Sequence, residues 1–207
     1  MNMFYKMISV LILSHVSLFA STADELKYAC KVDNNATACY FYALPLVTGE
    51  NAKVQDFRQE GLSYMRRACL EGERRGCDVM GENYYKDKNY GIAMKYLDPA
   101  CDSGVKTACE LMGMIYRDGH DVNPNDVKTR EYFDKACTLK SGSACFNVAI
   151  IYRGGFGVEK SRTKEKEYYK KGCDLGVQAA CKRFTDMDNE DKGIETGIMT
   201  TIKGWFQ

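Results

Sequence analysis

The chain has 207 residues, ten of them cysteine, and a formal net charge of +1. This length fits one domain that can bury a substantial core. The near-neutral charge and the lack of a Lys- or Arg-rich run argue against nucleic acid and against anionic membrane surfaces as partners.

The first 23 residues have the pattern of an export signal. Lys6 precedes an apolar stretch over residues 7–19, and the small residues Ser21 and Ala23 occupy the positions that a signal peptidase checks. The apolar stretch is too short for a comfortable transmembrane helix. We expect residues 1–23 to be a signal peptide cleaved after Ala23, with an uncleaved N-terminal anchor as the alternative. The mature chain would be secreted or periplasmic, without an integral membrane span.

Residues 24–185 are expected to form a repeat domain, because the cysteines recur in pairs. Four pairs are eight residues apart and begin at positions 69, 101, 137 and 173, which gives periods of 32, 36 and 36. The first pair is nine residues apart. A period in this range indicates a solenoid. The repeat units are expected at about 38–76, 77–108, 109–144 and 145–180.

Each unit is expected to contain two helices. In CELMGMIYRDG (109–119), apolar residues recur at three- and four-residue spacings, and Gly119 ends the run. Tyrosines that lie five residues before a first Cys or seven after a second Cys keep the same register, and we expect them in the core between helices. Glycines three residues after a first Cys suit a turn with positive φ. Gly81 and Gly113 indicate that a neighbouring helix passes too close for a side chain.

The two ends of the domain depart from this pattern. The first hairpin has Pro45 in its expected first helix, which favours a modified N-terminal cap. Residues 186–207 are expected to form a C-terminal capping helix, because Ile194, Ile198, Ile202 and Trp205 or Phe206 follow one helical face. The alternative is an exposed aromatic anchor for a partner or a membrane.

Residues 144–176, ACFNVAIIYRGGFGVEKSRTKEKEYYKKGCDLG, resemble a Sel1-like repeat, which is related to the tetratricopeptide repeat. The matching features are Ala144, Tyr152, the Gly-Phe-Gly-Val run at 155–158 and Gly176. The resemblance covers about residues 38–185. With a cysteine pair in each unit and a signal segment, the chain is similar to the Helicobacter cysteine-rich protein family. The resemblance implies an all-α fold, a right-handed α/α superhelix of Sel1-like helix pairs stapled by disulfides.

On this architecture, each cysteine pair joins the end of one unit to the start of the next. A turn of about six residues brings the two helix ends within the distance that a disulfide tolerates. Zinc is the alternative, but no thiolates lie two to four residues apart and His120 is the only histidine after the signal segment. A redox Cys-x-x-Cys is also lacking. We expect no metal or cofactor, and the disulfides Cys30–Cys39, Cys69–Cys77, Cys101–Cys109, Cys137–Cys145 and Cys173–Cys181.

The resemblance to the cysteine-rich family implies penicillin binding and β-lactamase activity, which is hydrolysis of a β-lactam amide bond and would confer antibiotic resistance. SGVK (103–106) and SRTK (161–164) match Ser-x-x-Lys, but no Ser-Asp-Asn or Lys-Thr-Gly accompanies them. Ser103 is expected inside a disulfide loop and Ser161 in a linker, neither beside an oxyanion hole. His120 is expected in a polar loop. The catalytic residue of such an enzyme therefore stays unassigned.

The alternative function is a non-enzymatic, monomeric interaction module. Its concave groove would bind a peptide, a cell-wall fragment, a β-lactam or a host protein, through residues one, five and eight positions after each second Cys. Arg117 and Arg153 are placed to hold a carboxylate. An ordinary solvated groove without a ligand is a further possibility. The binding candidates are Glu82, Tyr85, Met114, Arg117, Ile150 and Arg153, and Asp78, Glu110 and Phe146 share their face.

Overall fold

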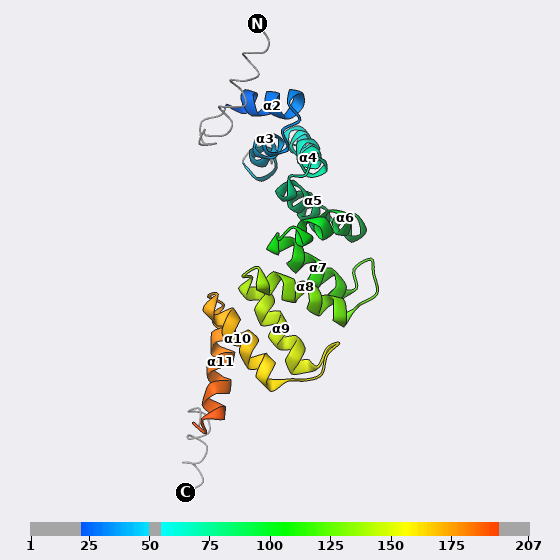
Figure 1. Ribbon diagram of the computed structural model, residues 1–207. Coiled ribbons are helices and arrows are strands. Elements are labelled where there is room, and N and C mark those ends of the chain that lie inside the picture. The colour runs from blue at the N-terminus through cyan, green and yellow to red at the C-terminus, as the bar shows by residue number, and fades with distance from the viewer. Residues whose placement is uncertain (1–21, 50–54, 195–207) are drawn as a thin grey trace. The chain divides into compact units, whose positions relative to one another are not determined.

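The computed structural model describes residues 22–49 and 55–194, which contain ten α-helices and no strand. The all-α fold predicted from the sequence is confirmed, and within each compact part of the chain neighbouring helices pack as helix pairs (Figure 1). The helices are α2 (Ala23–Val32), α3 (Ala36–Thr48), α4 (Gln55–Leu70), α5 (Arg74–Lys86), α6 (Tyr90–Asp102), α7 (Lys106–Asp118), α8 (Asp126–Thr138), α9 (Gly142–Gly154), α10 (Arg162–Asp174) and α11 (Gln178–Asp191).

The chain divides into two compact units, Met1–Gly76 and Cys77–Gln207. This boundary falls where the sequence places the junction between the repeats 38–76 and 77–108, although the sequence predicts one continuous domain. In the first unit, α3 packs against both α2 and α4. In the second unit, each helix from α6 to α11 packs against the next one.

The cysteine pairs join the ends of successive helix pairs, as predicted. The four bonds Cys30–Cys39, Cys101–Cys109, Cys137–Cys145 and Cys173–Cys181 have S–S distances of 1.98 to 2.08 Å. Their Cα atoms lie 4.4 to 4.7 Å apart, within the range for disulfides. Cys69 and Cys77 are also disulfide-bonded. Residues 22–49 and 55–194 therefore contain no free cysteine.

The turn inside the regular cysteine loops requires one left-handed residue. Gly72, Gly104 and Gly176, each three residues after a first Cys, have φ values of 97°, 91° and 88°. Lys140 takes the same position in the CTLKSGSAC loop with a φ of 64°. Lysine is disfavoured in this region because its Cβ crowds the backbone. Three of these four turns therefore have glycine, which the left-handed conformation favours. The fourth has Lys140, for which this conformation is strained.

The small residues inside the first helices are explained by the second helices that pack against them. A Cβ atom on Gly113 of α7 would lie 2.8 Å from the ring of Phe133 on α8. A Cβ atom on Gly81 of α5 would lie 2.6 Å from Leu97 Cγ on α6. These approaches are shorter than any normal carbon–carbon contact. They confirm the close passage of a neighbouring helix that the two glycines predict.

The in-register tyrosines form one stacked pair within each helix pair of the second unit. The pairs Tyr84–Tyr96, Tyr116–Tyr132 and Tyr152–Tyr168 have ring centroids 5.6 Å apart and nearly parallel planes. Stacked aromatic pairs contribute about 0.5–1.5 kcal/mol beyond the area they bury. Tyr116 and Tyr152 are buried and the other four tyrosines are partly buried, so these rings lie at the interface between the two helices of each pair.

Residues 1–21 of the expected signal peptide lie outside the described residues, whereas Thr22 caps α2 by accepting a hydrogen bond from the Glu25 backbone. Cleavage after Ala23 would remove this cap. At the other end, α11 continues through position 185, so the expected capping segment 186–207 begins inside a helix, and residues 195–207 lie outside the described residues. Among the helices of residues 22–49 and 55–194, none has the length and apolar character needed to span a bilayer.

Candidate functional site

The predicted groove residues lie on the first helices α5, α7 and α9 of the second unit, and two contacts link them. The Tyr85 hydroxyl on α5 lies 3.8 Å from the Met114 sulfur on α7. Arg117 on α7 and Ile150 on α9 line the same cavity. Glu82 instead forms an ion pair within α5, with its carboxylate 3.1 Å from Lys86 Nζ. The structure therefore brings together Tyr85 with Met114, and Arg117 with Ile150.

The cavity that holds Arg117 and Ile150 has a volume of about 330 Å³. Most of its wall is apolar, and Asp126, Thr129 and Asn147 line it together with Arg117. This composition is typical of a ligand pocket, which combines apolar walls with a few placed polar groups. The lining residues are Arg117, Asp126, Thr129, Phe133, Asn147, Ile150, Ile151 and Phe156.

Six of these eight residues are not predicted from the sequence as site residues, since only Arg117 and Ile150 are. Thr129 and Phe133 belong to the second helix α8, and Phe156 belongs to the α9–α10 connection. Phe156 is 49% exposed, which is unusual for such a large apolar side chain. The sequence signal that could have identified Phe156 is its position between Gly155 and Gly157. Both glycines have positive φ, so they form a turn that leaves the Phe156 ring exposed.

Thr129 is the most deeply buried polar residue of the cavity wall. It is 3% exposed, and its hydroxyl has no hydrogen-bond partner among the described residues. Buried hydroxyl groups are normally hydrogen-bonded, because leaving one unpaired is unfavourable. The Thr129 hydroxyl is therefore a polar group in the cavity wall that makes no hydrogen bond to the described residues.

Arg117 stands at the charged side of the cavity with part of its guanidinium already engaged. Its Nε and Nη2 donate to the Asp118 carboxylate at 2.7 and 3.0 Å, and these hydrogen bonds, together with the Arg117 charge, lower the pKa of Asp118. A guanidinium has five N–H donors, so three remain for another acceptor. The Arg117 side chain keeps 46% of its surface exposed. It can therefore accept a second carboxylate without leaving Asp118.

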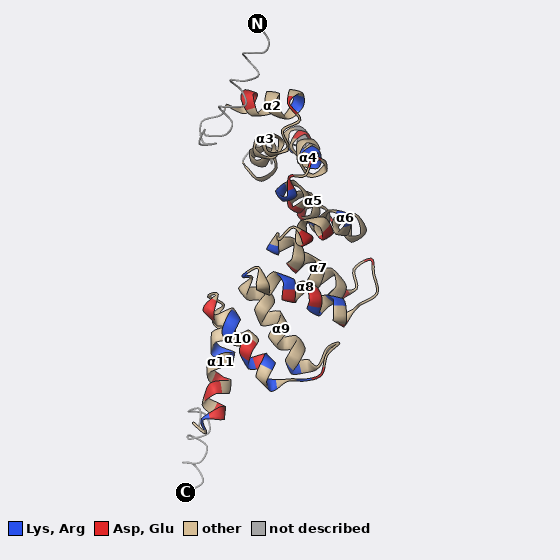
Figure 2. Ribbon diagram, in the orientation of Figure 1, with Lys and Arg blue, Asp and Glu red and all other residues tan. Residues whose placement is uncertain are grey.

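Arg153 has the equivalent position on α9, eight residues after the second Cys of its repeat. It is exposed, and no acidic side chain pairs with it in the part of the chain that the structure describes. It is also the one charged residue of α9, which is otherwise tan in Figure 2. The two arginines thus present positive charge at matching positions of successive first helices.

Asp78 and Glu110, which share the predicted groove face, connect successive first helices. The Thr107 hydroxyl of α7 donates to both carboxylate oxygens of Asp78 on α5, at 2.9 and 2.8 Å. Glu110 of α7 accepts a hydrogen bond from Ser143 of α9 at 3.0 Å, and another from Ser141. These acids therefore hold the first helices together. The third residue of the series, Phe146, packs against Tyr169.

The Asp78 carboxyl has a raised pKa because it is buried. Desolvation raises the pKa of this carboxyl to about 6, with the Glu82 charge adding to the rise, while the Thr107 hydrogen bonds and Lys86 oppose it. A raised pKa means that the folded chain binds the proton more tightly than the unfolded chain does. The carboxylate therefore lowers stability most fully above pH 6, and this penalty fades as the pH falls toward the unfolded pKa.

The Asp78→Asn variant is expected to be more stable than the parent at pH 8, by about 1 kcal/mol after solvent screening is allowed for. The amide oxygen can still accept the Thr107 hydrogen bond. The gain should shrink as the pH falls through 6 and vanish near pH 4. Urea unfolding followed by circular dichroism at pH 8, 6 and 4 measures this. Glu110→Asn is the control, and a gain for Asp78→Asn that did not change with pH would contradict the assignment.

The serines of the two Ser-x-x-Lys matches have structural roles at helix ends. Ser103 is the C-terminal cap of α6, and its hydroxyl donates to the Ala100 carbonyl at 2.8 Å. Ser161 is the N-terminal cap of α10, and its hydroxyl accepts from the Lys164 backbone. His120 stacks on Tyr90 with ring centroids 4.1 Å apart. Both serine hydroxyls therefore form hydrogen bonds with backbone groups at helix ends.

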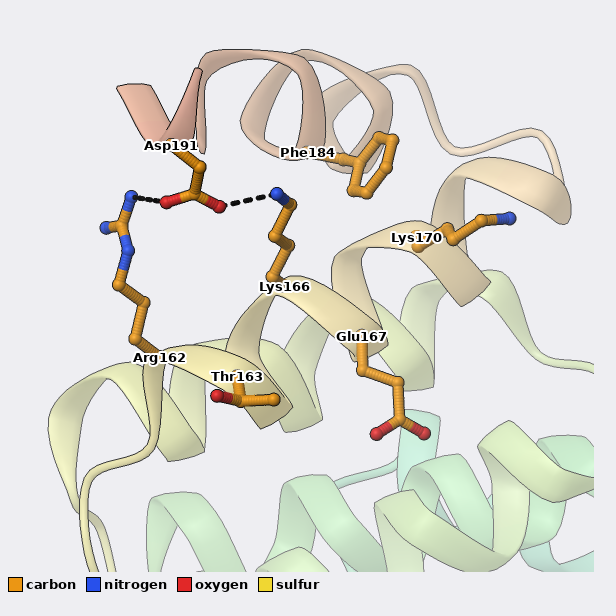
Figure 3. Close-up of a pocket in the computed structure, with 7 residues that line it drawn as sticks. All are labelled: Arg162, Thr163, Lys166, Glu167, Lys170, Phe184 and Asp191. Atoms are coloured by element: carbon orange, nitrogen blue, oxygen red, sulfur yellow. Dashed lines mark hydrogen bonds and ion pairs between the residues drawn. The ribbon is translucent and has the colours of Figure 1, made fainter. Parts of the chain in front are cut away.

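A second cavity, of about 420 Å³, lies between α10 and α11 (Figure 3). Arg162 and Lys166 of α10 both pair with Asp191 of α11, and Phe184 lies beside Lys166. The charged groups here are paired across the two helices, so this cavity offers fewer free donors than the first. In the described ranges, no cluster of three or more His, Cys, Asp or Glu side chains has the arrangement of a metal site.

Comparison with known proteins agrees with this geometry. The profile of the Sel1 repeat matches residues 36–73, 80–105, 107–141 and 142–177. A Sel1 repeat protein from Oxalobacter formigenes superposes with a TM-score of 0.73 and 19% identity, over 87% of this chain and 76% of that one. A protective antigen of uropathogenic Escherichia coli strains, which displays an SLR fold, gives a TM-score of 0.72 and 22% identity over 81% of this chain. This chain spans 36% of that antigen's length.

Cysteine-rich protein B of Helicobacter pylori also matches, with 22% identity over 78% of this chain and 96% of that one. Its TM-score of 0.32 is too low to indicate the same arrangement of helices. No curated protein matches the chain in sequence. The fold-level likeness therefore rests on the Sel1 repeat profile and on the first two structures.

Proposed function

Since this chain belongs to the Sel1 repeat family, whose members mediate protein interactions, we propose that it is an extracytoplasmic binding module rather than a hydrolase. The cavity bordered by α7, α8 and α9 is its binding site, and the ligand is a peptide segment with a free carboxylate beside an apolar side chain. The disulfide-rich fold fits an extracytoplasmic protein, because disulfides persist in oxidising compartments. Export by the signal segment, to the periplasm or beyond, is part of this proposal.

The observation that carries the proposal is the pairing of Arg117 with an apolar cavity in one site. Phe133, Ile150 and Ile151 provide the wall for an apolar side chain, and Arg117 keeps free donors for a carboxylate. Charge-assisted hydrogen bonds of this kind are among the stronger ones in proteins. Arg153, which lacks an internal ion pair among the described residues, adds positive charge near the same helix face.

Two sources of such a ligand share this chemistry. A protein partner would present a C-terminal carboxylate, and a cell-wall stem peptide would present its own terminal carboxylate, which penicillin mimics. Hydrolysis of a β-lactam is the weaker alternative, since Ser103 and Ser161 cap helices and no other nucleophile is assigned. A β-lactam bound through its carboxylate without turnover would fit the binding module.

The Arg117→Ala variant is expected to weaken binding of a hexapeptide with a C-terminal leucine carboxylate by about tenfold, the loss of one charge-assisted hydrogen bond. Adding Arg153→Ala should weaken it further. Isothermal titration with oxidised protein measures both. Lys95→Ala, at an exposed position of the second helix α6, is the control and should bind like the parent.

Three further measurements distinguish a protein C-terminus, a cell-wall stem peptide and β-lactam hydrolysis. The same hexapeptide with an amidated C-terminus should lose as much affinity as Arg117→Ala does. A stem peptide that binds more tightly than the hexapeptide would assign the cell wall as the source. The proposal fails if the double arginine variant binds like the parent, or if purified oxidised protein turns over nitrocefin through repeated purification.

A further inference from the structure

Thr129 of α8 has a buried hydroxyl that the packing of a helix pair does not require. The residue lies eight positions before a first Cys, where α6 has the fully buried Ala93 and α10 has the partly buried Glu165. The alanine shows that two helices of this fold pack without a polar atom at this position. In the cavity wall the Thr129 hydroxyl has no partner among the described residues. Because an unpaired buried hydroxyl is unfavourable, a ligand that bonds to it would remove this cost.

Asn147 of α9 is a second polar residue of this wall, at a position that is apolar in the two preceding repeats. It lies two residues after a second Cys, where α5 has Val79 and α7 has Leu111. All three residues are partly buried, whereas Arg183, at the matching position of α11, is exposed. The Asn147 amide makes no hydrogen bond to another described residue. In the repeat that borders this cavity, an unpaired amide therefore takes the place of a hydrocarbon side chain.

The polar groups of the wall differ in the hydrogen bonds that they can offer a ligand. The Thr129 hydroxyl and the Asn147 amide can each donate and accept. Asp126, one turn before Thr129 on α8, is exposed and can only accept when ionised. A ligand group that meets all three must provide both donors and an acceptor. A primary amide has two N–H donors and a carbonyl acceptor, whereas a hydroxyl has one donor and an ionised carboxylate has none.

We infer, on the basis of the proposed function, that Thr129 and Asn147 are specificity-determining residues that select a C-terminal residue with an amide at the end of its side chain, as in glutamine. Arg117 holds the terminal carboxylate of this residue in the proposed function. The two methylene groups of glutamine would lie against the apolar wall of Ile150 and Phe156. The side-chain amide would bond to Thr129 and Asn147, which otherwise stay unpaired. A site built to bond a polar group discriminates strongly against an analogue that lacks it.

The test compares hexapeptides that differ only in the C-terminal residue. In isothermal titration with the oxidised full-length chain, the glutamine peptide should bind about tenfold more tightly than the methionine peptide, whose side chain has a similar length but no amide. Thr129→Val and Asn147→Leu should each remove most of this preference by weakening the glutamine peptide alone. Thr138→Val, at an exposed position of the same helix α8, is the control and should keep the preference.

The stability of the free protein separates a binding role of Thr129 from a packing role. Valine has the shape of threonine and removes the unpaired hydroxyl, so Thr129→Val should be at least as stable as the parent in urea unfolding. Unchanged or higher stability together with weaker binding of the glutamine peptide would support a binding role. A lower unfolding midpoint would show that the hydroxyl is already bonded in the free protein, and would overturn the inference.

Three binding results have different consequences. Equal affinity of the glutamine and methionine peptides, with both still weakened by Arg117→Ala, would overturn the inference but leave the proposed function intact. Tighter binding of a peptide with a C-terminal lysine would also overturn it, because the polar wall would then select a cation at Asp126. Failure of every peptide to bind would overturn the proposed function itself, and the selectivity of Thr129 and Asn147 with it.

Discussion

Removing one internal disulfide by Cys137→Ala with Cys145→Ala is expected to lower the free energy of unfolding by about 2.5 kcal/mol. The bond closes a loop of eight-residue separation, and the chain-entropy estimate for such a loop is about 2.5 kcal/mol. Both cysteines are nearly fully buried, so alanine preserves the apolar surroundings but leaves a small void. Urea unfolding of the oxidised variant and parent by circular dichroism measures the difference.

Complete reduction should have a much larger effect. The four bonds Cys30–Cys39, Cys101–Cys109, Cys137–Cys145 and Cys173–Cys181 would together contribute about 10 kcal/mol in the same estimate, as much as the whole stability of an ordinary domain. We therefore expect a reducing agent to unfold or loosen the chain without urea. Cys173→Ala with Cys181→Ala is the matched variant for Cys137→Ala with Cys145→Ala, because the two bonds close loops of the same length. Cys173 and Cys181 are only partly buried, so the two variants differ in the burial of the removed bond. A reduced chain with the parent's unfolding midpoint would show that packing alone holds the fold.

Most of the fold could be predicted because the sequence repeats its structural constraints. The cysteine spacing sets the ends of each helix pair, and positive-φ positions such as Gly104 and Gly176 mark the turns between them. Gly113 predicts the close approach of a helix before Phe133 is known to be its partner. Each of these features is local, or recurs at a fixed distance along the chain. A single sequence is sufficient to recognise them.

The cavity could be predicted only in part, because it depends on contacts between helices. Periodicity assigns Arg117 and Ile150 to an exposed face, and the structure places both on the cavity wall. Thr129 lines the same wall from α8, yet nothing in its local sequence separates it from an ordinary core position. Asp78 has the pattern of a groove residue but hydrogen-bonds to Thr107 on the next first helix. The helix that contacts a given side chain is determined by the tertiary structure, and the repeat period does not predict it.

Substituting Gly113 is expected to have the second large effect, because its position combines a helix interior with a crowded interface. Alanine in a helix is favoured over glycine by about 1 kcal/mol, so an open site would gain stability. At Gly113 the new methyl would lie 2.8 Å from the rigid Phe133 ring, which is 1% exposed, so the ring or one of the two helices would have to shift. Overpacking of this kind costs about 1–3 kcal/mol, so we expect Gly113→Ala to be about 2 kcal/mol less stable than the parent in urea unfolding.

The control for that substitution is Gly91→Ala in α6. Gly91 is exposed, and its added methyl would meet only the Asp121 carboxylate at an ordinary 3.7 Å, so this variant should be neutral or slightly more stable. Adding Phe133→Leu to Gly113→Ala should recover part of the loss, and the double-mutant cycle gives the coupling energy. Equal effects of the two glycine substitutions would contradict the packing explanation. Since Phe133 also lines the cavity beside Arg117, Gly113→Ala should weaken peptide binding as well, which would tie the packing of the repeat directly to its binding site.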